Sequence, residues 1–166
     1  LCGVLSELPF NMVVSGTVFD PQHQNVLWTL SLGLAAIFAC DEIRKKCPGR
    51  GGVLLCLLPW LGACVLAEGL LTDYGCLGIL MIASFAYLRN HPALLVVALA
   101  VIAGPGVMIR DGFFGVPLEI FALLAFFFLF RYNGKRGAGG KAVQVFFYAF
   151  YPVHLLILGL LRLFLA

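Results

Sequence analysis

Charged side chains are scarce in this sequence: they make up 11% of its 166 residues, whereas an ordinary soluble domain has about 25%. Hydrophobic residues account for 62% of the chain and form long apolar runs. This balance excludes an ordinary soluble globular domain. We therefore expect a polytopic membrane protein that lies in the lipid bilayer and has no nucleic-acid partner.

Metal-binding and disulfide motifs are also missing. The six cysteines form no C-x-x-C pair and no cysteine–histidine pair at metal-ligand spacing. Most of them lie inside apolar runs, where a thiol behaves as a small hydrophobic group. We expect no bound metal and no disulfide framework. The sequence has no internal repeat, and it opens on Leu1 with no basic signal region, so we expect an N-terminally incomplete chain with one domain over residues 1–166.

The apolar runs predict an all-α transmembrane helix bundle of five or six spans, of which we count five as full, and a partial N-terminal helix. Residues 1–14 are the end of that partial helix, which Pro9 ends or bends. The apolar runs that follow are at residues 25–40, 52–71, 73–88, 92–109, 116–130 and 143–165. Those at 25–40, 73–88 and 116–130 are short for a bilayer and must borrow flanking residues. A Gly-Pro-Gly sequence predicts a break at 104–106.

Basic residues gather in alternate loops, at 44–50, at Arg89 and at 131–141. The intervening loops, which contain Asp73 and Asp111, carry no excess of positive charge. The positive-inside rule therefore places the three basic loops in the cytoplasm. The same asymmetry puts the linker at 9–24 on the outer face.

His154 is the unusual residue of the last apolar run. A helix rises ~1.5 Å per residue, so a helix entering from the cytoplasm near Val143 places His154 near the middle of the bilayer. An ionisable group at that depth usually faces a bundle interior or a water-filled cavity. Arg162 lies about two turns further on and can reach the outer interface. Pro152 removes one helical hydrogen bond and predicts a kink below the histidine.

Other polar residues converge toward the outer half of the predicted bundle. They are Glu7, His23, Gln24, Asn25, Glu68, Asp73, Tyr74 and Glu119. Burying so many polar groups without a cavity would be costly, so their convergence favours a polar site. Two alternatives stay open: Gln24 and Asn25 can cap a helix, and Asp73 with Gly75 can form a tight turn.

Five ordered motifs resemble the TraX family of membrane proteins. They are S-E-L-P-F at 6–10, H-Q-N-V-x-x-T-L at 23–30, D-Y-G-x-x-G at 73–78, Y-N-G-K-R-G at 132–137 and F-Y-x-x-Y-P-x-H-L-L-I-L at 147–158. The resemblance implies a multi-pass acetyltransferase of the bacterial cytoplasmic membrane, a family named for acetylating the amino terminus of conjugative pilin. It implies acetyl-CoA as the donor. Family members usually begin with a helix that bears an Asp-His pair and with a second helix, and this chain enters at the end of that second helix.

The polar residues suit three roles in an acetyl transfer. The base that removes the acceptor's proton is His154 or, as second candidate, His23. The candidates for donating a hydrogen bond to the developing oxyanion are Gln24, Asn25 and Tyr151. The candidates for orienting an imidazole or binding an acceptor ammonium are the carboxylates of Glu7 and Asp73.

A donor site is expected in the basic loop N-G-K-R-G-A-G-G-K at 133–141. Asn133, Gly134, Lys135 and Arg136 offer positive charge for the phosphates of acetyl-CoA and glycine for a close backbone approach. The alternative is a connector that only sets topology.

Three classes of function remain open at this point. The acceptor of an acetyltransferase would be a peptide amino terminus, a glycan or another small molecule, and an oligomer is possible. The first rival is a transporter or channel component that uses the polar stripe as a path for an ion or substrate. The second is a structural subunit of a membrane assembly.

Overall fold

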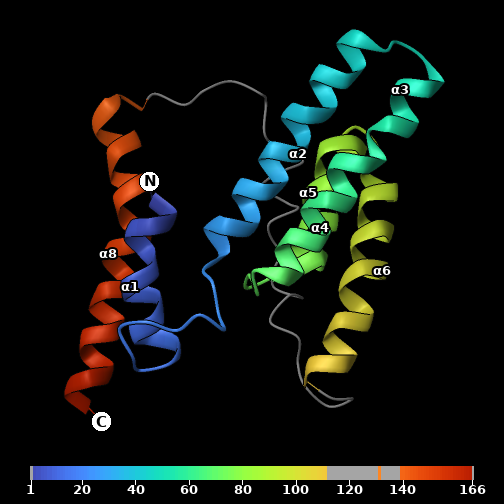
Figure 1. Ribbon diagram of the computed structural model, residues 1–166. Coiled ribbons are helices and arrows are strands. Elements are labelled where there is room, and N and C mark those ends of the chain that lie inside the picture. Colours follow the sequence, from blue (N-terminus) through green and yellow to red (C-terminus); the bar gives the residue numbers. More distant parts are fainter. Residues whose placement is uncertain (1, 112–130, 132–138, 166) are drawn as a thin grey trace. The chain divides into compact units, whose positions relative to one another are not determined.

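The computed structural model describes residues 2–111, 131 and 139–165, and its regular elements within these residues are all helices (Figure 1). They are α1 (Cys2–Val14), α2 (Val26–Lys46), α3 (Arg50–Leu55), α4 (Leu57–Gly69), α5 (Gly75–Leu88), α6 (Pro92–Asp111) and α8 (Lys141–Leu165). The all-α prediction is confirmed. The apolar run predicted at 116–130 lies outside the described residues.

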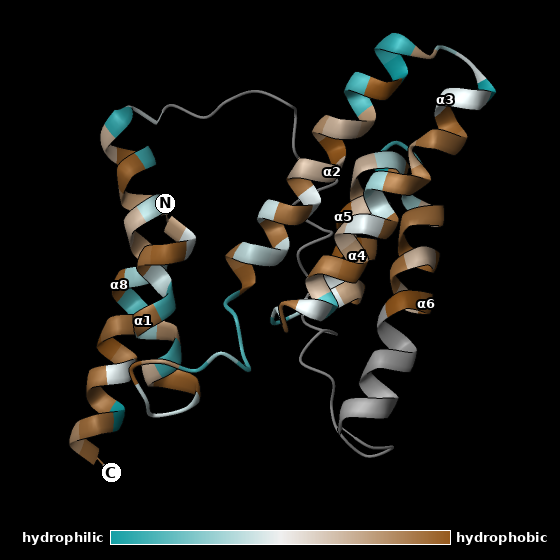
Figure 2. Cartoon of the chain, viewed as in Figure 1, coloured by the Kyte–Doolittle hydropathy of each residue, from teal (hydrophilic) through white to brown (hydrophobic). Residues whose placement is uncertain are grey.

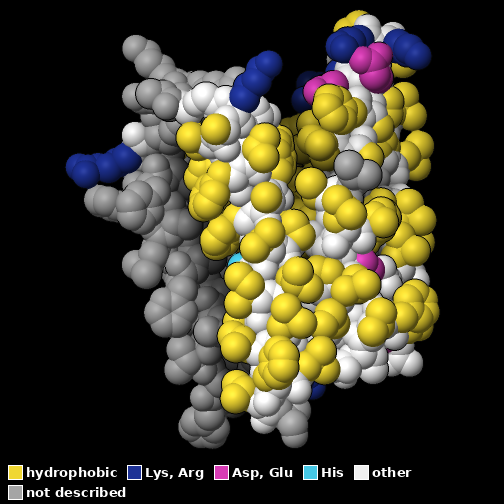
Figure 3. Space-filling view, turned by 90° about the vertical axis from the view of Figure 1, so that its left-hand side faces the viewer, with side chains coloured by type: hydrophobic (Ala, Val, Ile, Leu, Met, Phe, Trp, Pro, Cys, Tyr) yellow, Lys and Arg dark blue, Asp and Glu magenta, His cyan; other side chains and the backbone are white. Residues whose placement is uncertain are grey.

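Three segments are long and apolar enough to cross a membrane: Val26–Lys46, Arg50–Gly69 and Lys141–Leu165. Shorter apolar helices occupy Cys2–Val14, Gly75–Leu88 and Pro92–Ile102. Figure 2 shows hydrophobic residues along most helices and hydrophilic ones at the carboxyl end of α2 and in the linker before it. In Figure 3, hydrophobic side chains cover much of the face in view. These features fit a multi-pass membrane protein, and the count of five full spans stays a prediction.

Prolines do not end the helices that contain them, and the bends predicted at Pro9 and Pro152 stay predictions. Pro9 lies inside α1, which continues to Val14, and Pro152 lies inside α8. The expected break at 104–106 does not end α6, which runs to Asp111. A proline removes one backbone hydrogen bond, and an apolar helix tolerates that loss when the freed carbonyl finds another partner. The predicted run 52–71 is divided at Cys56, where α3 ends and α4 follows.

The chain forms two compact units, Leu1–Ile79 with Ala138–Ala166, and Leu80–Gly137. In the second unit, Leu95 and Leu99 of α6 are buried against apolar residues of α5. The first unit contains α1 to α4, the start of α5, and α8. All the described candidate site residues lie in this first unit. The single-domain assignment stays a prediction.

Small residues allow close helix packing in the first unit. Ala36, Ala63, Ala67 and Ile79 form its buried apolar cluster. A Cβ atom added at Gly78 would lie 2.6 Å from Cγ2 of Thr29, so the start of α5 touches α2 with no room for a side chain. Small residues serve this purpose in membrane proteins, where van der Waals packing holds the helices together.

α1 and α8 lie side by side and run in the same direction (Figure 1). A Cβ atom at Gly159 would lie 2.9 Å from Cβ of Met12 and 3.6 Å from the carbonyl oxygen of Pro9. Near the end of α8, the Arg162 guanidinium donates to the carbonyl oxygen of Val13. This bond satisfies a carbonyl at the end of α1, where a positive charge is favourable. Arg162 therefore fastens the end of α8 to the end of α1.

The linker between α1 and α2 is tied to the turn between α4 and α5. Gln24 forms a parallel bridge with Thr72. The amide of Gln24 donates to the carbonyl of Leu71 at 3.0 Å, and the amide of Asp73 donates to the carbonyl of Gln24 at 2.9 Å. Asp73 is thus held beside the start of α2.

Glu68 stabilises the turn between α4 and α5, because its Oε1 accepts a hydrogen bond from the Cys76 amide at 2.7 Å. Gly75 has a φ of +48°, and a Cβ atom there would lie 2.5 Å from Oε1 of Glu68. The tight-turn alternative for Asp73 and Gly75 is therefore confirmed. Glu68 has a structural role as the cap of α5.

Candidate functional site

The packing of α1 on α8 places Glu7 and His154 at the same height. Met12 of α1 lies against Gly159 of α8. The two helices run in the same direction with the same rise per residue, so equal steps along both keep their residues level. Five residues before Met12 is Glu7, and five residues before Gly159 is His154. An acid and an imidazole from distant parts of the chain thus lie level on neighbouring helices.

His154 has a defined tautomer. Its Nδ1 lies 2.9 Å from the carbonyl oxygen of Phe150. A carbonyl oxygen can only accept, so Nδ1 carries the proton of the neutral ring and Nε2 keeps its lone pair. The ring stacks on Phe150 at 5.0 Å between centroids and meets the edge of Tyr151 at 5.5 Å. His154 is therefore a half-buried imidazole that can accept a proton at Nε2.

The two carboxylate oxygens of Glu7 differ in their hydrogen bonds. Oε2 accepts from the indole N–H of Trp28 at 3.0 Å and also from the side-chain amide of Asn25. Oε1 is buried and has no hydrogen-bond partner among the described residues. A buried carboxylate oxygen without a donor costs free energy, and a ligand with an N–H or O–H group would remove that cost.

Asn25 connects this carboxylate to the start of α2. Its Oδ1 accepts from the Leu27 amide at 3.0 Å, which confirms that Asn25 caps the helix. Its Nδ2 donates to the carbonyl of Gly3 at 2.8 Å and to Glu7. Asn25 is fully buried, with 0% of its surface exposed. Both of its N–H groups are used in these bonds.

Tyr151 approaches the same point from α8. Its hydroxyl lies near the backbone of Val26 and within electrostatic range of Glu7 and Asp73. A phenol hydroxyl can donate its proton to a ligand. Tyr151 thus links α8 to the point where Glu7 and Asn25 join α1 to α2, and its ring also contacts that of His154.

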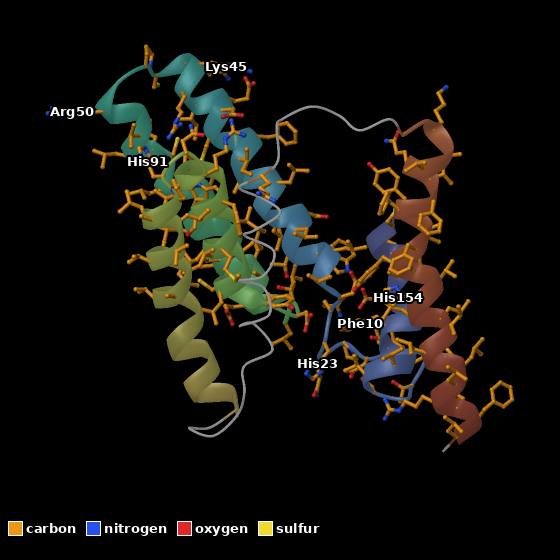
Figure 4. All side chains as sticks on the ribbon, turned by 180° about the vertical axis from the view of Figure 1, so that it is seen from behind. Phe10, His23, Lys45, Arg50, His91 and His154 are labelled. Atoms are coloured by element: carbon orange, nitrogen blue, oxygen red, sulfur yellow. The ribbon has the colours of Figure 1, made fainter. Side chains whose placement is uncertain are left out.

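The two remaining candidates occupy the edge of the site and the linker. Asp73 is exposed, on the turn that the Gln24 bridge holds next to α2. His23 is exposed too, and its Nδ1 lies 3.7 Å from Oδ2 of Asp20. Figure 4 shows His154 on α8 and His23 on the linker before α2. The structure therefore separates the two histidines.

Asp20 organises that linker. Its carboxylate accepts from the Ser15 hydroxyl and from the Gln22 amide, the latter at 2.9 Å. These bonds, the Ser15 bond first, lower the pKa of Asp20 from its usual value of 3.8. The environment of His23 is thus that of a solvated loop.

Sequence reasoning did not single out Trp28. A signal was present: a partly buried indole N–H almost always finds an acceptor, and Trp28 is one of two tryptophans in the chain. The expected donor residues Asn133, Gly134, Lys135 and Arg136 lie outside the described part of the chain. Among the described residues no group of three His, Cys, Asp or Glu could hold a metal ion.

A comparison with protein families matches residues 1–162 to the family model described as TraX protein. The match covers nearly the whole chain. No curated protein matches the sequence, and no solved structure matches it.

Proposed function

The chain belongs to the TraX family, and from this premise we propose that it is a membrane-embedded acetyltransferase that uses acetyl-CoA. The main support for the proposal is Glu7: its Oε1 is buried without a hydrogen-bond partner among the described residues, and the packing of α1 on α8 puts this residue level with His154. Tyr151, which contacts the ring of His154 and lies within electrostatic range of Glu7, would supply the hydroxyl donor between them. The acceptor is an amine or a hydroxyl, as on a peptide amino terminus, a glycan or another small molecule.

The transfer assigns one task to each residue. The acceptor's N–H or O–H donates to Oε1 of Glu7, and its nitrogen or oxygen attacks the carbonyl carbon of the thioester. Nε2 of His154 takes the acceptor's proton, and the Tyr151 hydroxyl donates to the oxyanion that forms. The carbon–sulfur bond then breaks, and the coenzyme A thiolate takes the proton from His154. The products are the acetylated acceptor and coenzyme A.

Asn25 has a different role in this scheme from the one its residue type suggested. Both of its N–H groups are used by Gly3 and Glu7. We therefore assign the oxyanion contact to Tyr151 and assign Asn25 to holding the carboxylate. His23 pairs with Asp20 on the exposed linker, so His154 is the base that we propose.

The donor and acceptor arrive from opposite sides in this proposal. We place the basic loops in the cytoplasm of a bacterial cell, with the chain in its inner membrane. Asn133, Gly134, Lys135 and Arg136 then bind the phosphates of cytoplasmic acetyl-CoA. The linker and the Asp73 turn face the outer side, from which the acceptor enters.

The test is a transfer assay with purified protein, labelled acetyl-CoA and a peptide with a free amino terminus. His154→Gln keeps hydrogen bonding but cannot act as a base, so we expect turnover to fall by about 10²–10⁴-fold. His91→Gln is the matched control, because His91 is exposed between α5 and α6. A fully active His154→Gln protein would remove the histidine from the mechanism.

Stability separates chemistry from a bridging role for the same histidine. If His154 only bridges helices, His154→Gln is active and His154→Ala loses about 0.6 kcal/mol of stability. A wild-type protein that coenzyme A neither stabilises against heat nor retains on a column would contradict the proposed enzyme. Ion flux into proteoliposomes would then be the measurement for the transporter alternative.

A further inference from the structure

The hydrogen bond from Trp28 to Glu7 carries an inference that rests on the proposed function and deepens it. Two donors bind the same oxygen of Glu7, the indole of Trp28 at 3.0 Å and the amide of Asn25. The other oxygen, Oε1, is buried and has no partner among the described residues. The two oxygens of one carboxylate therefore have different environments.

A glutamate carboxylate rotates easily about its last torsion, so something must keep its two oxygens distinct. The donor directions are fixed here. An indole N–H can only donate. The amide of Asn25 cannot turn over without losing its cap bond to the Leu27 amide. Asn25 is the N-cap of α2 and Trp28 lies in its first turn, so the start of one helix holds both donors in place.

We propose that Trp28 is a positioning residue that holds Oε2 of Glu7 and thereby presents Oε1 to the acceptor beside His154. Without the indole N–H, Asn25 alone remains on Oε2, and the carboxylate can turn so that either oxygen takes either place. The acceptor is then held in several orientations, of which only some direct its proton to Nε2 of His154. The bond to Trp28 therefore acts on turnover more than on donor binding.

Trp28→Phe tests this role because it keeps a six-membered aromatic ring and removes the five-membered ring that carries the N–H. We expect turnover to fall by about 10-fold to 10²-fold, the loss that a displaced reacting group produces. The Michaelis constant for acetyl-CoA stays unchanged, because the donor site is elsewhere. Trp28→His keeps a ring N–H and restores part of the loss. Trp60→Phe is the matched control, since Trp60 packs against the apolar cluster of α2, α4 and α5.

A double-mutant cycle tests whether Trp28 acts through Glu7. In a Glu7→Gln protein, Trp28→Phe should have little further effect on turnover, because the group that it positions is already changed. Losses that multiply in the double variant would show that Trp28 acts independently of Glu7 and would overturn the proposal.

Spectroscopy tests the contact without any assay of transfer. In the Trp60→Phe protein, Trp28 is the only tryptophan, and its ultraviolet resonance Raman spectrum reports the strength of the indole N–H hydrogen bond. We expect Glu7→Gln to shift the N–H band toward a weaker bond. A band that does not move would overturn the contact.

The outcomes separate this inference from the proposed function. A wild-type protein that transfers no acetyl group contradicts both. If the wild type is active and the Trp28→Phe and Trp60→Phe variants have the same turnover, only the positioning role is contradicted.

Discussion

Gly159→Ala would test the packing that makes Glu7 level with His154. The added Cβ would lie 2.9 Å from Cβ of Met12, both atoms being fixed to helix backbones. Carbon atoms in good contact lie ~3.5–4.0 Å apart, so α8 must move away from α1 by roughly 1 Å. The matched control is Gly62→Ala in α4, where an added Cβ meets nothing within 4 Å.

The expected change in stability follows from two opposing effects. Overpacking a close contact costs about 1–3 kcal/mol. Alanine favours a helix over glycine by about 1 kcal/mol, and this gain is the same in both variants. Gly62→Ala should therefore be slightly stabilising, and Gly159→Ala should be less stable than Gly62→Ala by about 1–3 kcal/mol. A displacement of roughly 1 Å would also reduce acetyl transfer by up to ~10²-fold.

The assay is unfolding of both purified variants in detergent, followed by circular dichroism, with transfer rates measured on the same preparations. If the two variants have equal stability and equal turnover, α1 and α8 do not pack closely at Gly159. Glu7 and His154 would then not lie level.

Three further predictions concern the loops. In a cysteine-free protein, Thr17→Cys should react with an impermeant maleimide applied outside the cell and Lys46→Cys only after permeabilisation, and the reverse pattern would invert the topology. Neutralising Lys135 and Arg136 together should raise the Michaelis constant for acetyl-CoA and weaken its salt dependence, with acceptor binding unchanged; an unaltered constant would leave the loop a topology signal. The pKa of Asp20 is lower in the folded protein than its usual value of 3.8, so the hydrogen bonds of its carboxylate stabilise the folded state fully above pH 3.8. This stabilisation is lost as the pH falls through the lower pKa that Asp20 has in the folded state. Hydrogen exchange in residues 15–23, corrected for intrinsic rates, should therefore increase in strong acid, and Asp20→Asn should remove this pH dependence.

The sequence determined the helical class and much of the local structure. Apolar runs predict helices because a backbone in lipid must satisfy its own hydrogen bonds. Asn25 caps α2 and the Asp73 turn forms where the local residue types favour them, since capping and turn formation depend on near neighbours. The polar residues that meet at the site, Glu7, Asn25, Tyr151 and His154, could also be singled out from residue type and depth.

Only the tertiary structure decided which of these polar residues meet and which bonds they make. Glu7 belongs with Trp28 and Asn25 because α1 packs on the start of α2, and it lies level with His154 because Gly159 lets α8 approach Met12. These pairs join residues far apart in the chain, and helical periodicity carries no information on contacts between helices. The same holds for His23, which sequence depth placed with His154 and which folding leaves on the linker with Asp20. Local chemistry fixes where helices start and which face is polar, whereas the close approach of particular small residues fixes which polar groups share a site.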